Sequence, residues 1–232
     1  MSLSDPSPRA SALALASVNP QGKALGLRPG DILLRVDGHA VDGKTKDIQA
    51  LFREHPDRAR ALWIWRDGQV WPVLGRSAIL GRWRVMPKPE VIVTLPDHRP
   101  TDRMQNFDVM IGPDETYDAQ PRTPSVVALL PPLYMIQMRL WTPLILWAAL
   151  TLVSVPLGWI AGAALQMLIC VYFWRAAPML VRTDRTARGF RLWRVIAARS
   201  ERELHRQMTT LAPDLRFVHA PVRTVPKPVE AR

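Results

Sequence analysis

The feature that most constrains this chain is a long apolar block. In residues 126–180 the charged side chains are Arg139 and Arg175, and residues 140–174 carry no charge. A helix that crosses a membrane needs about 20 apolar residues, so the block is too long for one helix and fits two. Because backbone groups in hydrocarbon must be hydrogen-bonded within the protein, both legs are expected to be helical.

Proline and glycine interrupt the block near its middle, at Pro156 and Gly158. Proline removes a backbone donor and glycine frees the backbone, which predicts a turn. The sequence therefore predicts a transmembrane helical hairpin over residues 131–181, with legs at 133–155 and 160–181.

Two alternatives to a membrane-spanning hairpin stay open. One is a buried helical hairpin in a soluble protein, and the length of the uncharged run argues against it. The other is a re-entrant hairpin that enters one leaflet only, which Pro143, Pro156 and the short legs allow.

Small residues near the turn are predicted to allow close helix packing, either of the two legs or of a partner helix. These residues are Gly158, Gly162 and Ala163.

Aromatic and arginine side chains flank the two legs. Tryptophan and tyrosine prefer the membrane–water interface, and arginines after the second leg place that flank in the cytoplasm by the positive-inside rule. A hairpin returns the chain to the side where it began, so the sequence predicts a multi-pass protein of the inner (cytoplasmic) membrane with both termini cytoplasmic. The expected interface residues are Tyr134, Arg139, Trp141, Trp159, Trp174, Arg175, Arg182 and Trp193.

The segment after the hairpin is strongly basic, in a chain of net charge +11. Phe190, Trp193 and Ile196 recur at near-helical spacing among arginines, which predicts a basic amphipathic helix over residues 182–212 on anionic lipid headgroups. Nucleic-acid binding is the competing interpretation, and it is set aside because arginines beside a span are already explained by topology. Residues 213–232 are predicted to form an extended tail.

Before the apolar block, short strand patterns alternate with turn signals. Residues 10–18 alternate with a period of two, and Asp-Gly pairs at 37–38 and 67–68 are typical of tight turns. Residues 45–55 have apolar side chains on one helical face. The pattern predicts an α+β fold for this part of the chain.

Three runs in this region carry a resemblance. Val18-Asn19-Pro20, Gly26-Leu27-Arg28-Pro29-Gly30-Asp31 and Val36-Asp37-Gly38 resemble a bacterial-type PDZ domain, which is assigned to residues 9–80. The resemblance implies a small β-sandwich or barrel with one or two short helices. Glycines permit its tight turns, and an aspartate can accept backbone hydrogen bonds. The residues expected to structure its loops are Gly26, Gly30, Asp31 and Gly38.

PDZ domains bind an extended peptide by adding it as a strand beside one of their own. The resemblance implies that residues 12–18 receive the peptide and that the helix at 45–55 faces it. The family's glycine-containing carboxylate loop is replaced here by residues 7–11. The residues implied to form the groove are Leu13, Leu15, Ser17, Ile48, Leu51 and Phe52.

No motif for catalysis or metal binding occurs in the sequence. The five histidines form no H-E-x-x-H pair, and nucleophile elbows, phosphate loops and dinucleotide fingerprints are missing. Cys170 is the single cysteine, so it has no disulfide partner in the chain. We therefore expect a protein that is not an enzyme, with no cofactor and no metal.

Composition predicts the character of two further segments. Residues 1–8 are predicted to be disordered, and residues 81–130 to be a proline-rich linker with a possible strand at 91–95.

Together these features predict a membrane-anchored scaffold, assembly or accessory subunit of a larger membrane complex. Its expected partners are integral-membrane proteins, anionic lipid headgroups and an extended peptide, with no nucleic acid. The alternatives are a regulatory subunit that presents substrates to a membrane protease, and a structural subunit that binds no peptide.

Overall fold

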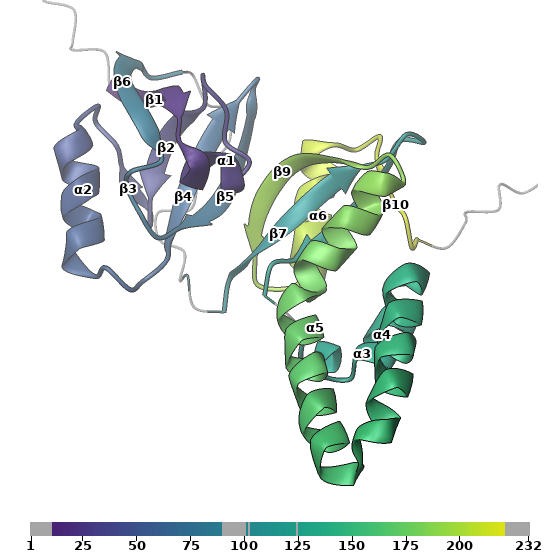
Figure 1. Cartoon of the computed structure of the whole chain (residues 1–232). Helices are drawn as coiled ribbons and strands as arrows, with labels where there is room; N and C mark the ends of the chain where they lie inside the picture. Colours follow the sequence, from purple (N-terminus) through teal and green to yellow (C-terminus); the bar gives the residue numbers. More distant parts are fainter. Residues whose placement is uncertain (1–10, 90–100, 102, 124, 221–232) are drawn as a thin grey trace, which may run out of the picture.

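The computed structural model describes residues 11–89, 101, 103–123 and 125–220, and two β-sheets form its body (Figure 1). The first sheet has the strand order β5-β4-β2-β1-β6, with β3 paired to β2. Its elements are β1 (Ser11–Val18), α1 (Pro20–Ala24), β2 (Ile32–Val36), β3 (His39–Ala40), α2 (Thr45–Glu54), β4 (Arg60–Arg66), β5 (Gln69–Gly75) and β6 (Gly81–Pro87). This mixed fold, with an antiparallel sheet, is consistent with a PDZ-like architecture.

The Asp-Gly pairs close hairpins of this sheet, as predicted. Asp37 and Gly38 have φ of 49° and 87°, and Asp67 and Gly68 have φ of 50° and 79°. Two consecutive residues with positive φ match the right-handed twist of the flanking strands. The second pair joins β4 to β5, whose register runs from Arg66 opposite Gln69.

Strand β6 was not expected, because residues 81–130 were predicted to be a linker. It pairs antiparallel with the whole of β1, from Ser11 opposite Pro87 to Val18 opposite Gly81. Glycine is required where β6 begins, since a Cβ on Gly81 would lie 1.9 Å from the Ser17 carbonyl oxygen. The strand proposed at 91–95 lies outside the described residues.

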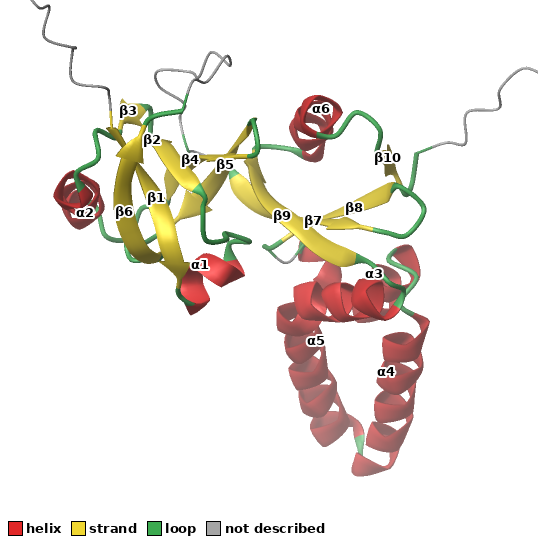
Figure 2. Cartoon of the chain, turned by 90° about the horizontal axis from the view of Figure 1, so that it is seen from above, coloured by secondary structure: helices red, strands yellow, loops and turns green. Residues whose placement is uncertain are grey.

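The second sheet is built from segments far apart in the sequence, with the strand order β10-β8-β7-β9. Strands β7 and β8 form an antiparallel hairpin, β9 pairs antiparallel with β7, and β10 pairs parallel with β8. Its elements are β7 (Gln105–Ile111), β8 (Thr116–Pro121), β9 (Arg191–Ala198), α6 (Glu201–Leu211) and β10 (Arg216–Phe217). Figure 2 shows α6 on one side of this sheet and the long helices on the other.

The prediction of one basic helix over residues 182–212 is therefore wrong. The preceding helix ends at Ala187, Gly189 adopts φ of 88°, and the chain continues as β9 and α6. The segment fills a place beside β7 and buries Val195 and Ile196 completely, which a surface helix on lipid does not do. Strand β10 also lies within the predicted tail.

One hydrophobic core runs through both sheets. Trp71 and Val73 of the first sheet belong to the same cluster of buried side chains as Val109 and Val195 of the second. Burial of shared apolar surface stabilises the contact between the two sheets.

The remaining helices lie between β8 and β9 in the sequence. Helix α3 packs against η1 and α5, while α4 and α5 form a hairpin that projects from the body (Figure 1). The elements are η1 (Val126–Leu129), α3 (Pro131–Gln137), α4 (Trp141–Ser154), η2 (Val155–Leu157) and α5 (Trp159–Ala187). Gly158, with φ of 80°, makes the turn between the two legs.

The first leg expected at residues 133–155 is divided into two helices. The break lies after α3, where Arg139 has φ of 57°, and α3 buries Tyr134 and Met135. Packing of α3 against η1 and α5 therefore shortens the apolar first leg to Trp141–Leu157.

Candidate peptide edge and membrane-facing surface

Strand β1 cannot receive a peptide, contrary to the prediction for residues 12–18. One of its edges pairs with β2 and the other with β6. A strand whose two edges are occupied has no free row of N–H and C=O groups for another strand.

Strand β6 is one of the two terminal strands of this sheet. Within the described residues β6 pairs with β1 only, so its outer edge has no partner strand there. Helix α2 lies beside β6 in Figure 2. Val85 of β6 is 62% exposed, and its Cγ1 lies 3.2 Å from the position of a Cβ on Gly43, just before α2. An open strand edge next to a helix is the geometry that strand addition needs.

The predicted groove residues are mostly core. Leu13 and Leu15 have no exposed surface, and Ile48 and Phe52 are also buried in the same cluster. Leu51 is half-buried, and Ser17 is exposed. Sequence reasoning missed Trp83 and Val85, which lie opposite Leu15 and Leu13. Their alternation in residues 81–87 was the signal that could have found them.

Asp31 holds the loop before β2. It is buried, it accepts a hydrogen bond from the Arg28 N–H at 2.8 Å, and it accepts two from the Arg66 guanidinium at 2.5 and 2.7 Å. Gly26 and Gly30 in this loop have φ of 70° and 95°, and Gly38 lies in the next turn. A Cβ on Gly26 would lie 3.2 Å from Val195, so the loop also touches the second sheet.

Comparison with known proteins supports the assignment of the first sheet. Residues 16–66 match the family model of the PDZ domain. A search of curated proteins found no match. The matched segment supports a PDZ domain in this part of the chain and a role in protein interaction or scaffolding.

An arginine lies between the two sheets. Arg194 of β9 is 4% exposed, and its guanidinium carbon lies 4.1 Å from the Trp71 ring centre and 4.2 Å from that of Trp193. Burial, with a further contribution from Arg66, lowers the pKa of Arg194 to about 10. Stacking of the cation on the two rings offsets part of the cost of burying it.

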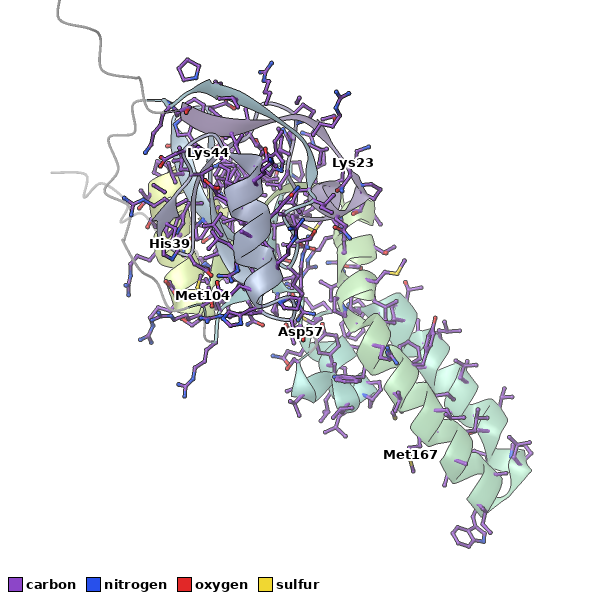
Figure 3. The ribbon with its side chains drawn as sticks, turned by 90° about the vertical axis from the view of Figure 1, so that its left-hand side faces the viewer. Lys23, His39, Lys44, Asp57, Met104 and Met167 are labelled. Atoms are coloured by element: carbon purple, nitrogen blue, oxygen red, sulfur yellow. The ribbon has the colours of Figure 1, made fainter. Side chains whose placement is uncertain are left out.

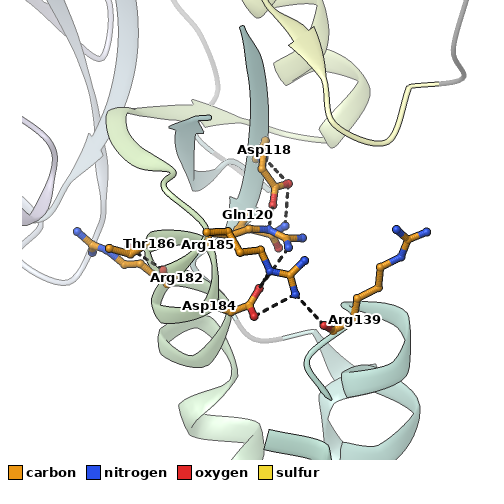
Figure 4. A network of polar contacts seen from close by, with 9 residues as sticks. Asp118, Gln120, Arg139, Arg182, Asp184, Arg185 and Thr186 are labelled. Carbon is orange, nitrogen blue, oxygen red and sulfur yellow. Dashed lines mark hydrogen bonds and ion pairs between the residues drawn. The ribbon is translucent and has the colours of Figure 1, made fainter. Parts of the chain in front are cut away.

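A buried ion pair joins the second sheet to α5 (Figure 4). Arg185 donates to Asp118 of β8, and both side chains are at most 5% exposed. Asp118 also accepts from the Ala119 N–H and the Gln120 amide. Asp184 lies 3.3 Å from Arg185, so the end of the long helix is fastened to the sheet by charge.

The predicted interface residues fall into three groups. Trp141 and Trp159, at the ends of the legs, are exposed, as are Arg139, Arg175 and Arg182. Trp174 is half-buried between helices. Tyr134 is buried in α3, and Trp193 lies in β9, so neither occupies the membrane-facing position predicted for it.

Small residues of the hairpin have separate positions. Gly162 faces the first leg, because a Cβ there would lie 3.2 Å from the Ser154 carbonyl oxygen. Ala163 is exposed. Thr151 and Gln166 hydrogen-bond across the legs at 3.2 Å, which adds a polar contact to the packing.

Titratable groups meet at one place in the second sheet. The Tyr117 hydroxyl lies 2.7 Å from Nδ1 of His205, whose Nε2 lies 3.4 Å from Glu201. Burial, and then the charge of Glu201, raises the pKa of Tyr117. A phenol with a raised pKa is poorly suited to act as a nucleophile. In the described part of the chain no cluster of metal-ligating side chains occurs.

Proposed function

We propose that this protein is a membrane-anchored, non-catalytic scaffold, assembly or accessory subunit of a larger integral-membrane complex. In this proposal the α4–α5 hairpin holds a PDZ-bearing body at the cytoplasmic face of the inner membrane. The observation that carries it is the exposed apolar surface of the hairpin.

The hairpin exposes the side chains that a protein in water would bury. Trp159 at its tip is 84% exposed, and Met167 points away from the helices in Figure 3. Soluble monomers rarely expose contiguous apolar patches larger than a few hundred Å². Other exposed apolar side chains on the two legs are Ile145, Leu146, Leu152, Val153, Val155, Ile160, Leu168 and Tyr172.

The lengths of the legs support a short span. By length and composition α5 is the one described helix able to cross a membrane, and the first leg is the shorter apolar segment Trp141–Leu157. At 1.5 Å per residue that leg is about 25 Å long, against a hydrocarbon core of about 30 Å. Local thinning of the bilayer accommodates a deficit of this size.

The partner surface follows from the open edge of β6. A peptide or an exposed strand of a partner can pair with β6 and place a side chain beside Val85 and α2. Main-chain pairing supplies affinity in this mode, and no catalytic group is needed. A scaffold held at the membrane by the hairpin would meet integral-membrane partners first.

Topology is tested with cysteine labelling in intact cells. Cys170→Ser removes the single cysteine, and Gly158→Cys then marks the turn. We expect an impermeant thiol reagent, added from outside the inner membrane, to label the turn. In a separate variant without Cys170, a cysteine placed near the C-terminal end by Thr209→Cys should stay unlabelled. Labelling of the turn from the cytoplasmic side would refute the full span and favour a re-entrant hairpin. Release of the protein from membranes by alkaline carbonate would refute anchoring.

Partner binding is tested with a matched pair of variants. Val85→Lys places a charge at the open edge, and Ile79→Lys changes an equally exposed residue, at 64%, just before β6. After gentle detergent extraction, we expect Val85→Lys to lose co-purified partners that wild type and Ile79→Lys retain. Equal partner recovery from all three would refute use of this edge. A membrane protease among the lost partners would favour the substrate-presenting alternative.

A further inference from the structure

A cavity of about 890 Å³ lies where the PDZ-bearing sheet, the second sheet and α5 meet. Ala24 of α1, in the PDZ-bearing part of the chain, lines the cavity, and so does Arg122, which follows β8. Helix α5 contributes Pro178, Met179 and Arg182, together with two threonines. The cavity therefore joins the membrane helix to the PDZ-bearing body.

The position of the cavity along α5 sets its depth in a membrane. From Trp159 at the tip to Met179 the helix rises about 30 Å, at 1.5 Å per residue. This equals the thickness of the hydrocarbon core. If Trp159 lies at the far interface, Met179 lies at the near edge of the hydrocarbon, or about 5 Å above that edge where the bilayer is thinned to the first leg. Arg182 lies about one turn further, among the headgroups.

The wall at this level is basic and rich in donors. The Arg182 side chain is 48% exposed, and it lies 3.9 Å from Asp108. Arg122 binds Asp108 at 2.6 Å and also donates to the Ala24 carbonyl. Asp108 offsets one of the two positive charges, and Arg182 retains donors for an anion, with the exposed Thr183 hydroxyl beside it.

Two apolar residues of α5 also line the cavity. Met179 is 73% exposed, and Pro178 lies next to it on α5. A ligand that fits this arrangement carries an anionic group at one end and hydrocarbon at the other.

We propose that this cavity is a binding site for the headgroup of an anionic phospholipid. The lipid phosphate accepts hydrogen bonds from Arg182 and Thr183, and the glycerol and first acyl carbons lie along Pro178 and Met179. The proposal rests on the proposed function, because it needs the hairpin in a bilayer. A bound lipid would contact α1 and α5 together and so stabilise the orientation of the PDZ-bearing unit relative to the membrane.

The test uses the full-length protein in nanodiscs of phosphatidylcholine, with and without phosphatidylglycerol. The variants are Arg182→Gln and its matched control Arg175→Gln, which removes an exposed arginine of the same helix outside the cavity lining. We expect phosphatidylglycerol to raise the thermal midpoint of wild type and of Arg175→Gln. For Arg182→Gln we expect the apparent affinity for this lipid to fall roughly tenfold, the loss typical of a charge-assisted contact.

The other possible results of this experiment refute either the lipid site or the proposed function. Equal loss in the two variants would show surface attraction without a site and overturn the proposal. Inorganic phosphate that stabilises the detergent-solubilised protein equally well, through Arg182, would show a soluble phosphate ligand and also overturn it. Failure of wild type to enter nanodiscs of either composition would refute the proposed function, whereas normal entry without preference for the anionic lipid refutes only this site.

Discussion

Replacement of Asp118 by asparagine should destabilise the protein through the buried charge that it leaves behind. Asp118 has no exposed surface and pairs with Arg185, whose side chain is 5% exposed. Asparagine keeps an oxygen for the hydrogen bonds from Ala119 and Gln120, but its NH2 group replaces the oxygen that accepts from Arg185, so the variant removes both the charge and that acceptor.

The size of the effect follows from what remains around Arg185. Loss of one partner of a buried ion pair typically costs 3–5 kcal/mol. Asp184 stays 3.3 Å from Arg185 and is partly exposed, so it compensates in part. We therefore expect a loss of about 3 kcal/mol, at the low end of that range.

The assay is denaturant unfolding in a mild detergent, followed by tryptophan fluorescence. Arg185→Met should also destabilise, and the double variant Asp118→Asn/Arg185→Met should regain most of the loss, because no unpaired charge stays buried. Arg188→Met is the control, since Arg188 forms an exposed pair with Asp184 and should change stability by less than about 1 kcal/mol. Additive losses in the double variant, or a loss for Asp118→Asn no larger than for Arg188→Met, would refute this reasoning.

Three further predictions concern the sheets. Gly81→Ala should lower the free energy of unfolding by about 1–3 kcal/mol, because the added Cβ would lie 1.9 Å from the Ser17 carbonyl oxygen. Hydrogen exchange of the β6 amides should then be faster than in wild type. Unchanged protection of these amides would contradict the pairing of β6 with β1. Asp31→Asn should lower the free energy of unfolding by about 2 kcal/mol, since Asp31 accepts two hydrogen bonds from the Arg66 cation. A thermal midpoint equal to that of wild type would rule this out. Because the pKa of Tyr117 is raised above 10.0 in the folded protein, its contribution is fully present below pH 10 and is lost as the pH rises through the folded value. Wild type should therefore lose stability relative to Tyr117→Phe only above pH 10, and a difference that grows on acidification instead would refute the assignment.

Local patterns in the sequence predicted the tight turns and helix α2 correctly. The Asp-Gly pairs at residues 37–38 and 67–68 make turns because their backbone preferences are intrinsic. The helix expected at residues 45–55 is present as α2, since its apolar spacing matches one helical face. The PDZ resemblance agrees with the family match over residues 16–66.

The pairing of strands that lie far apart in the sequence could not be predicted from local patterns. The local sequence of Gly81–Pro87 does not show that this segment pairs with β1. The partner of a strand depends on the register and burial of residues far away in the sequence. The basic segment shows this most clearly. Its spacing of Phe190, Trp193 and Ile196 fits a helix approximately, but the edge of β7 offered backbone partners, and β9 filled that place.

The sequence by itself determined the apolar character of the hairpin and the positions of tight turns in the PDZ-bearing part of the chain. Both depend on local properties, namely the hydropathy of neighbouring residues and the backbone conformations that they prefer. The tertiary structure decided which strand edge stays open, how long the first leg is, and that Arg182 lies by a cavity shared with α1. These features depend on contacts between residues far apart in the chain, whose free energy exists only once the two sheets and α5 have packed together.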